Sequence, residues 1–152
     1  WTGRDIYLNI GAAVSNVYVW VNGKFVGYSE DSHLSASFDI TKYVHSGENL
    51  IALQIFRWCD GSYLEDQDLW RLSGISRDVE LIALPKARLT DMMITPHLDA
   101  QYTDATLDVK MDFTSGVKSA TVKLLDAAGA TVAEQTATPR GGKAELTFDV
   151  KK

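Results

Sequence analysis

Between two strand-like segments lies the stretch RWCDGSYLEDQDLWRLSGI, which occupies residues 57–75. It contains two of the chain's four tryptophans, four acidic side chains, two arginines and two glycines. A connection of this length is uncommon in a compact domain unless it has a function, and its content of Trp, Tyr and Leu is unlike that of a flexible linker. We therefore expect an ordered loop that is packed by its own aromatic side chains and holds carboxylates in a fixed place.

Outward from this loop, apolar residues recur at every second position, which is the period of a β-strand. The pattern predicts strands at residues 6–10, 17–21, 24–28, 37–40, 50–56 and 78–84. The strand at 17–21 has valines on one face and Tyr18 and Trp20 on the other, so it is expected to be central. Asn22 and Gly23 accept the positive φ angles of a tight turn and predict a hairpin. Gly27 predicts a bulge or the close approach of another backbone.

The character of the chain changes after Pro85. Tryptophan is absent from Arg71 onward, and the strands become regular amphipathic alternations, expected at residues 88–95, 107–113, 120–125, 130–137 and 144–150. Strands separated by turns about every ten residues predict an all-β fold of the sandwich or jelly-roll type. The five later strands indicate part of an immunoglobulin-like sandwich, whose usual complement is about seven. The second unit is therefore expected to be truncated.

Composition and charge exclude several classes of protein. The 152 residues are 45% apolar and 23% charged, as in ordinary globular domains. The net charge of -5 provides no basic face for nucleic acid, and no apolar run is long enough to cross a membrane as a helix. No signal peptide is visible, and a chain that opens on Trp1 is expected to begin inside a longer protein. A single Cys59 cannot form an internal disulfide, and the compartment stays undecided.

The acidic residues of the loop are candidates for catalysis, because glycosidases use two carboxyl groups roughly 5–9 Å apart. Acidic residues in a loop rich in Gly and Ser more often cap turns or accept backbone hydrogen bonds, so the residues alone favour a structural role. Their spacing lacks the alternating oxygen ligands of an EF-hand. Arg57 and Arg71 are expected to pair with these carboxylates.

The other candidate groups lack the context that their chemistry needs. The three histidines, His33, His45 and His97, lie among turn residues without the spacing of metal ligands. No serine has a neighbouring histidine or a Gly-x-Ser-x-Gly context that would make it a nucleophile. The lone Cys59 is expected to be a small packed residue.

Asp60 allows two interpretations. It follows an apolar strand and lies between Trp58 and Gly61, a setting in which an aromatic face and a carboxylate could bind a sugar. An aspartate at the end of a strand also commonly caps a turn. The residues by themselves leave both interpretations open.

Several motifs resemble the large bacterial β-galactosidases of glycoside hydrolase family two. They are YVWVNGK at 18–24, VGYS at 26–29, FDIT at 38–41, GEN at 47–49, the stretch 57–75, and RDV at 77–79. The resemblance runs from about residue 6 to residue 84. From residue 88 onward it is one of position and strand pattern.

This resemblance implies an architecture. The family has a sugar-binding jelly roll of the galactose-binding-like type, an immunoglobulin-like sandwich, and a TIM barrel that carries two catalytic glutamates. Residues 1–85 would then be the C-terminal part of the jelly roll and residues 86–152 the N-terminal part of the immunoglobulin-like domain. The barrel would lie outside this chain. We therefore expect no catalytic residue here, and no activity of the chain alone.

The resemblance carries one functional residue. The Asp of the Arg-Trp-x-Asp-Gly-Ser motif, here Asp60, looks like the residue that contacts the galactosyl unit and helps to ligate a sodium ion. The magnesium of such enzymes would be bound at the barrel, outside this chain, and no ion is expected for the chain alone. Glu65, Asp66 and Asp68 also match the motif, and we expect them to fix the loop. The sequence departs from the family pattern at Cys59, where Ser is common, at His33, where Arg is common, and at Ser76, where an aromatic residue is usual and whose change is expected to loosen the loop.

The expected partners are a galactoside substrate and the remaining domains of the same enzyme, itself a homo-oligomer, with no nucleic acid and no membrane. The isolated chain should bind sugar negligibly, because one side chain cannot offset the cost of ordering a site built from several domains. It should self-associate through unpaired strand edges. Two alternatives stay open: a stand-alone carbohydrate-binding module, or a purely structural domain that braces the enzyme.

Overall fold

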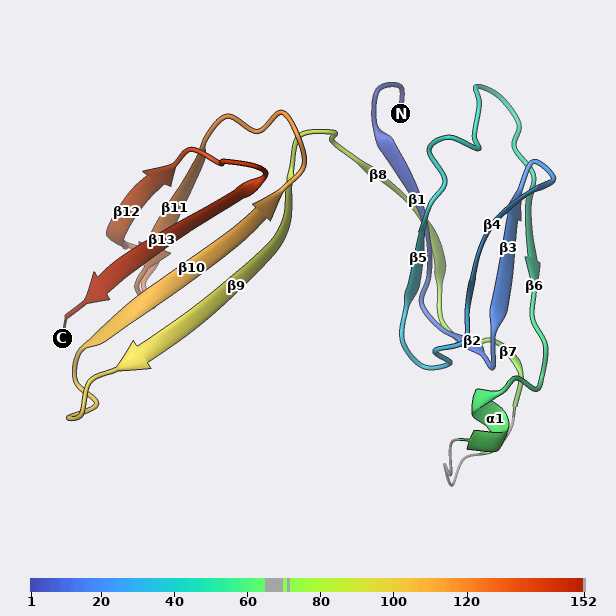
Figure 1. The fold of residues 1–152 in the computed structure, drawn as a ribbon, viewed down its shortest axis with the longest axis horizontal. Helices are drawn as coiled ribbons and strands as arrows, with labels where there is room; N and C mark the ends of the chain where they lie inside the picture. The colour runs from blue at the N-terminus through green and yellow to red at the C-terminus, as the bar shows by residue number, and fades with distance from the viewer. Residues whose placement is uncertain (65–69, 71, 152) are drawn as a thin grey trace. The chain divides into compact units, whose positions relative to one another are not determined.

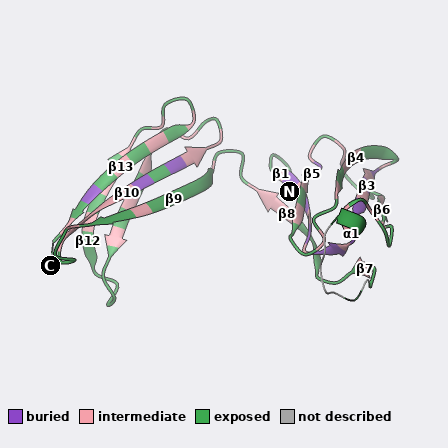
Figure 2. Ribbon diagram, turned by 60° about the horizontal axis from the view of Figure 1, so that its bottom comes forward, coloured by how far each residue is buried: buried purple, intermediate pink, exposed green. Residues whose placement is uncertain are grey.

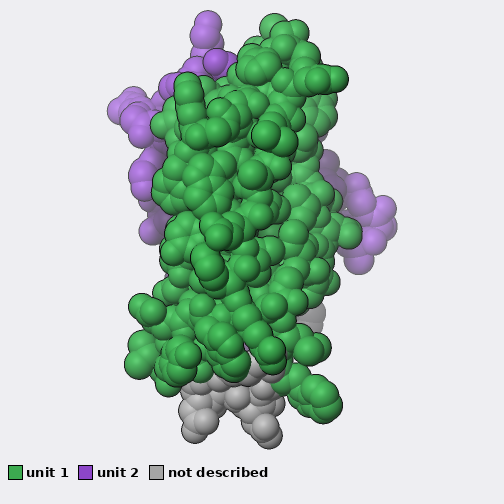
Figure 3. Space-filling model, turned by 90° about the vertical axis from the view of Figure 1, so that its right-hand side faces the viewer, with its two compact units in different colours: residues 1–85 green, residues 86–152 purple. Residues whose placement is uncertain are grey.

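The computed structural model describes residues 1–64, 70 and 72–151. This part of the chain is all-β except for one short helical turn, as the alternation of apolar residues predicts. It divides into two compact units, Trp1–Pro85 and Lys86–Lys152, called unit 1 and unit 2 below (Figure 3). None of the helices in the described residues is long and apolar enough to cross a membrane.

Unit 1 contains two three-stranded antiparallel sheets (Figure 1). One has the order β5-β1-β8 and consists of β5 (Ala36–Asp39), β1 (Asp5–Ile10) and β8 (Val79–Leu84). The other has the order β4-β3-β6 and consists of β4 (Lys24–Ser29), β3 (Val17–Val21) and β6 (Ile51–Gln54). A short pair, β2 (Ala13–Val14) with β7 (Gly74–Ile75), completes the unit. The strand at 17–21 is central in its sheet, as its two apolar faces predict.

The core of unit 1 lies between the two sheets. Alternate residues of the two central strands are almost completely buried, among them Leu8 and Ile10 on β1 and Val19 and Val21 on β3, at 0–1% exposure. Each such side chain contributes about 1.5–3 kcal/mol relative to an exposed position. These two strands therefore supply most of the core of unit 1, and the loops between strands contribute few buried side chains.

The hairpin between β3 and β4 forms as predicted, with positive φ angles of 52° at Asn22 and 75° at Gly23. The Asn22 side chain also accepts a hydrogen bond from Leu50 N–H, which ties the turn to the start of β6. A register shift near Gly27 confirms the expected bulge. The close approach at Gly27 comes from a side chain rather than a backbone, because a Cβ atom there would lie 2.8 Å from the ring of Phe38.

Unit 2 contains a three-stranded sheet and a hairpin. The sheet has the order β13-β10-β9, from β13 (Lys143–Val150), β10 (Ala105–Phe113) and β9 (Leu89–Leu98). The hairpin pairs β11 (Ala120–Leu125) with β12 (Thr131–Ala137) and covers β10 and β13. Figure 2 shows buried positions on β10 and β13 and none on β9. The buried core of unit 2 consists of Val109, Met111 and Phe148.

Candidate functional site

The stretch 57–75 leaves β6 at one end of unit 1 and returns through β7 (Figure 1). Its first part forms a single helical turn, α1 (Gly61–Leu64), which the sequence pattern did not predict. Glu65, Asp66, Asp68 and Arg71 lie outside the described residues, so their expected structural roles stay predictions. The described residues of this stretch nevertheless show how the segment around Asp60 is held.

A short segment between β1 and β3 fastens both ends of the loop. The N–H and the hydroxyl of Ser15 both donate to the carbonyl of Phe56, at 3.3 and 3.2 Å, and the Phe56 N–H donates to Oδ1 of Asn16 at 3.0 Å. At the returning end, the N–H of Ser76 donates to the carbonyl of Ala12 at 3.2 Å, beside the β2–β7 pair. Residues 12–16 therefore anchor the loop on both sides.

Ser15 and Asn16 are only 5% and 4% exposed. A buried polar side chain must keep its hydrogen bonds, because its removal leaves a partner unsatisfied at a cost of about 1–3 kcal/mol. The sequence analysis missed both residues. The signal that could have revealed them is the pair of adjacent polar residues just before the most apolar strand of the unit.

Asp60 occupies the position before the first residue of α1. Its backbone carbonyl accepts hydrogen bonds from Tyr63 N–H at 3.0 Å and Leu64 N–H at 3.1 Å. Its side chain is exposed, and no hydrogen bond or ion pair to its carboxylate occurs among the described residues. The carbonyl of Asp60 thus accepts the first hydrogen bonds of the turn, and its carboxylate is exposed at the start of α1.

Aromatic side chains flank Asp60. The rings of Trp58 and Tyr63 lie 6.2 Å apart at an angle of 35°, and the guanidinium carbon of Arg57 lies 5.4 Å from the Trp58 ring centre. The expectation of a loop packed by its own aromatics does not hold for the described residues, because Tyr63 is 79% exposed and Trp70 is 89% exposed, and the Trp58–Tyr63 contact lies at the surface. Apolar surface of this extent on a loop is typical of a contact with another protein segment.

Cys59 fastens the same turn. Its N–H donates to the hydroxyl of Ser62 at 3.1 Å, and its thiol donates to the carbonyl of Ser15 at 3.9 Å. Partial burial opposes ionisation of this thiol, but hydrogen bonds to the sulfur from the side chains of Ser15 and Ser62 and from the backbone of Ser62 and Gly61 outweigh that effect and lower the pKa of Cys59 below its ordinary value. The residue is half-buried and is packed as expected.

The histidines do not converge on a metal site. His33, His45 and His97 are all exposed, and they lie in separate parts of the two units. Within the described residues, no group of three or more His, Cys, Asp or Glu side chains could hold a metal ion.

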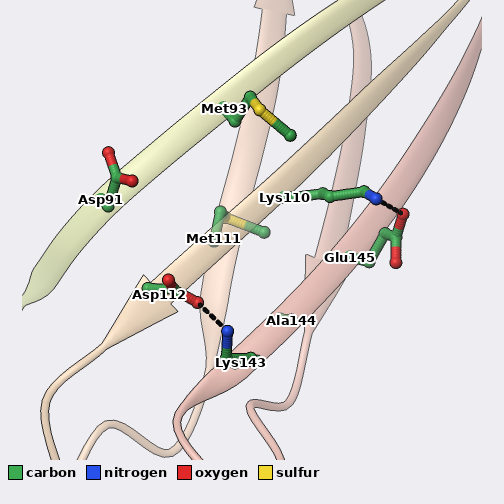
Figure 4. A pocket seen from close by; sticks show the side chains of 8 residues that line it. All are labelled: Asp91, Met93, Lys110, Met111, Asp112, Lys143, Ala144 and Glu145. Atoms are coloured by element: carbon green, nitrogen blue, oxygen red, sulfur yellow. Dashed lines mark ion pairs between the residues drawn. The ribbon is translucent and has the colours of Figure 1, made fainter.

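A hollow of about 420 Å³ lies in unit 2 (Figure 4). Two ion pairs cross it, from Lys110 to Glu145 at 3.4 Å and from Lys143 to Asp112 at 3.5 Å. All four side chains are about half exposed or more, and such surface pairs contribute little to stability. This hollow is a solvated sheet face rather than a second site.

Known proteins resemble this chain in two ways. The β-galactosidase of Priestia megaterium is 48% identical over 112 residues, which are 74% of this chain and 11% of that protein. The β-galactosidase of Alteromonas mediterranea is 46% identical over 130 residues, 85% of this chain and 12% of that protein. The chain thus spans about a tenth of the length of the curated relatives it matches.

Solved structures are similar in fold. The β-glucuronidase of Bifidobacterium dentium matches with a TM-score of 0.81 at 21% identity, over 99% of this chain and 31% of that one. An FMN-binding β-glucuronidase from Facaelibacterium prausnitzii matches with a TM-score of 0.82 at 24% identity, over 99% of this chain and 25% of that one. At this level of identity the likeness concerns the fold alone.

The part of the chain that contains Asp60 matches a known protein family. Residues 1–85, which coincide with unit 1, match the family described as "Glycosyl hydrolases family 2, sugar binding domain". The resemblance drawn from the motifs at 18–29, 38–49 and 57–79 is therefore confirmed. The chain belongs to glycosyl hydrolase family 2, and its first 85 residues match the sugar-binding domain of that family.

Proposed function

We propose that this chain is a non-catalytic portion of a β-galactosidase, an enzyme that hydrolyses terminal β-D-galactosides with retention of configuration. The observation that carries the proposal is the identity of 46–48% with the two β-galactosidases over most of the chain. In this proposal residues 1–85 are the C-terminal part of the jelly roll, and residues 86–152 are the N-terminal part of an immunoglobulin-like domain. The catalytic glutamates belong to a barrel elsewhere in the enzyme.

Asp60 is the residue that this portion contributes to the active site. Its exposed carboxylate has two oxygens that can accept hydrogen bonds from sugar hydroxyls. The same oxygens suit a hard cation such as sodium, and Asp60 would be one of several ligands. When bound, the cation would supply positive charge near a sugar hydroxyl. Magnesium, if present, would be held by residues outside this chain.

The anchoring of the loop supports this role. A carboxylate that binds a substrate must be held in place by its surroundings. Ser15 and Asn16 hold the backbone at Phe56, and Ser62 holds the backbone at Cys59, next to Asp60. The chain therefore presents Asp60 from a fixed turn rather than from a flexible connection.

The test is Asp60→Ala in the full-length enzyme, with hydrolysis of a chromogenic β-galactoside as the readout. We expect kcat/KM to fall on the order of a hundredfold, as for the loss of one charged contact to the transition state. Activation by sodium should be lost as well. Asp31→Ala, which removes another exposed carboxylate of unit 1, is the matched control and should retain full activity. Wild-type kinetics in Asp60→Ala would refute the assignment.

A stand-alone carbohydrate-binding module is the second candidate, favoured by the sugar-binding description of the matching family. Calorimetric titration of the isolated chain with galactose separates the two. Our proposal expects no binding at millimolar sugar, because the site would be completed elsewhere. Millimolar or tighter binding that Asp60→Ala abolishes would favour the module.

A purely structural role is the third candidate, favoured by the 89% exposure of Trp70. In that case Trp70→Ala would damage assembly of the full-length enzyme while Asp60→Ala left its activity unchanged. Under our proposal, Asp60→Ala should lower kcat/KM more than Trp70→Ala does.

A further inference from the structure

Two pairs of residues in unit 1 have the composition that forms a cyclic imide, Asn22-Gly23 and Asp60-Gly61. They are the chain's single Asn-Gly pair and its single Asp-Gly pair. In each, glycine follows a side chain that ends in a carbonyl carbon, Cγ, and glycine has no Cβ to hinder an attack of its backbone nitrogen on that carbon. The two pairs lie at opposite ends of unit 1, one in the turn between β3 and β4 and the other at the start of α1 (Figure 1).

The chemistry is the same at both pairs. The glycine nitrogen bonds to Cγ and gives up its proton, and the side chain releases ammonia at Asn22 or, from the protonated carboxyl group, water at Asp60. A water molecule then opens the five-membered imide. Breaking the bond from nitrogen to Cγ leaves an aspartate, and breaking the bond from nitrogen to the main-chain carbonyl carbon leaves an isoaspartate. The reaction needs no oxidant, reductant or enzyme.

In an unfolded chain Asn22 would react before Asp60. An aspartate carboxyl group in water is ionised at neutral pH, and a carboxylate is a much poorer electrophile than a neutral amide. This order is the reference with which the folded chain is compared.

The folded hairpin immobilises the amide of Asn22. Its Nδ2 donates to the carbonyl of Tyr43 at 2.9 Å and to Oδ1 of Asn49 at 2.8 Å, and its Oδ1 accepts from the Leu50 N–H at 2.9 Å. The backbone N–H of Asn22 also donates to the Leu50 carbonyl at 2.8 Å. All of these partners lie on the segment that precedes β6. Ring closure would have to break the three side-chain bonds and turn Cγ toward the Gly23 nitrogen.

The side chain of Asp60 is not held in this way. Its carboxylate is exposed, and no hydrogen bond or ion pair to it occurs among the described residues. The Gly61 N–H reaches the sulfur of Cys59, which is a weak acceptor. The helix α1 is a single turn of four residues, and helices of this length are only marginally stable. Ring closure at Asp60 therefore requires the opening of one turn, whereas at Asn22 it requires separation of the hairpin from the segment before β6.

We propose that Asp60-Gly61, rather than Asn22-Gly23, is the site at which the folded chain converts spontaneously to isoaspartate. Folding thus reverses the order of reaction of the unfolded chain. An isoaspartate at position 60 has one more carbon in the backbone and one fewer in the side chain, so the carboxylate leaves the place that α1 gives it. The modification itself does not depend on the proposed function, and only its effect on galactoside hydrolysis does.

Incubation of the chain in water enriched in heavy oxygen, followed by peptide mapping in a mass spectrometer, tests the proposal. Each opening of the imide adds one heavy oxygen, and isoaspartyl peptides elute apart from aspartyl peptides. Relative to the chain unfolded in urea, labelling at Asn22 in the folded chain should slow on the order of a hundredfold or more, and labelling at Asp60 by less than about tenfold. Earlier labelling of Asn22 than of Asp60 in the folded chain would overturn the proposal, as would an unlabelled Asp60.

Two variants test the assigned causes, with tryptophan fluorescence to verify that unit 1 stays folded. Gly61→Ala places a methyl group beside the attacking nitrogen, and a helical turn accepts alanine, so labelling at Asp60 should be lost while Asn22 is unaffected. Asn49→Ala removes one partner of the Asn22 amide and should speed labelling at Asn22 alone. Persistent labelling of Asp60 in Gly61→Ala would refute the cyclic imide. An equal rise at both pairs in Asn49→Ala would mean that unfolding of unit 1 sets the order, and would overturn the proposal.

The effect on function is measured separately in the full-length enzyme. Hydrolysis of a chromogenic β-galactoside should fall in step with the fraction of isoaspartate at position 60. Activity that persists while isoaspartate accumulates would count against the proposed role of Asp60 and would leave the labelling order intact. Failure of one idea is therefore distinguishable from failure of the other.

Discussion

Units 1 and 2 each contain a three-stranded antiparallel sheet with apolar residues at alternate positions. The two units differ in how completely the apolar side chains of that sheet are buried. In unit 1 a second three-stranded sheet covers the first, and Ile10, Val19 and Val21 are completely buried. In unit 2 the second layer is a two-stranded hairpin, and Ile94 on β9 is 51% exposed although it pairs with Val109, which is 1% exposed. Apolar alternation along a strand places the apolar side chains on one face of the sheet. A second layer that packs against this face is needed to bury them.

The two units also differ in their spectroscopic signals. All four tryptophans, Trp1, Trp20, Trp58 and Trp70, belong to unit 1. Tryptophan fluorescence therefore follows the unfolding of unit 1 alone, while backbone circular dichroism follows both units. This separation allows the comparison to be tested in the intact chain.

The largest effect is expected from Phe148→Ala in unit 2. A buried Phe replaced by Ala costs about 3–5 kcal/mol, and the buried core of this unit has only three members. We expect the cooperative transition of unit 2 to disappear from the circular dichroism signal at a denaturant concentration where wild-type unit 2 is folded. The fluorescence transition should stay in place.

The matched change in unit 1 is Leu8→Ala, for which a loss of about 2–5 kcal/mol is expected. Because the buried core of unit 1 is larger, we expect a shifted but still cooperative fluorescence transition. If Phe148→Ala moved the fluorescence transition, or if Leu8→Ala moved the whole circular dichroism transition rather than the part that belongs to unit 1, the two units would unfold as one body and the comparison would fail.

A smaller effect is expected from Asn16→Ala. The change removes the acceptor of the Phe56 N–H in a buried position, which costs about 1–3 kcal/mol in the unfolding of unit 1. In the full-length enzyme it should also lower kcat/KM, because the segment that carries Asp60 is no longer fixed. Asn9→Ala removes an exposed hydrogen bond to Glu80 and should change stability by less than about 0.5 kcal/mol. Equal effects of the two variants would argue against a positioning role for Asn16.

The smallest effect concerns Asp108 on the outer face of unit 2. A hydrogen bond from the Thr147 hydroxyl, at 2.7 Å, and a second contact with His97 lower the pKa of Asp108 below its ordinary value of 3.8. A carboxyl with a depressed folded-state pKa adds stability above its unfolded pKa, and this stability is lost as the pH falls through the folded-state pKa. Thr147→Val should therefore raise the pKa of Asp108. The free energy of unfolding of unit 2 should then decrease less on acidification than it does in the wild type.

Carboxyl NMR titration measures this pKa directly. Thr121→Val is the control, because the Thr121 hydroxyl bonds the Thr136 hydroxyl rather than a carboxylate. An unchanged pKa of Asp108 in Thr147→Val would contradict the assigned cause.

Most strands could be predicted because their signals are local. The alternation along β1, β3, β10 and β13 and the positive φ angles at Asn22 and Gly23 depend only on neighbouring residues and on the period of a strand. The motif around Asp60 could likewise be recognised from adjacent residues. The short β2–β7 pair could not, because Val14 and Gly74 are 60 positions apart and neither lies in an alternating run.

The support of the candidate site was also hidden in the sequence. The hydrogen bond between Asn16 and Phe56 joins residues 40 positions apart. The sequence around either residue does not indicate that the two are in contact. The same holds for Val79 and Leu81 of β8, which are 43% and 46% exposed although their apolar alternation resembles that of a buried strand. Their exposure follows from the absence of a facing layer, which no local pattern records.

The sequence by itself determined the strands, the hairpin turn and the family of the chain, because alternation, turn chemistry and motif spacing act over a few residues. The tertiary structure alone decided which apolar faces are buried and which polar pair holds the loop of Asp60. Those properties depend on the packing of one layer against another, and packing brings together side chains that are distant in the chain.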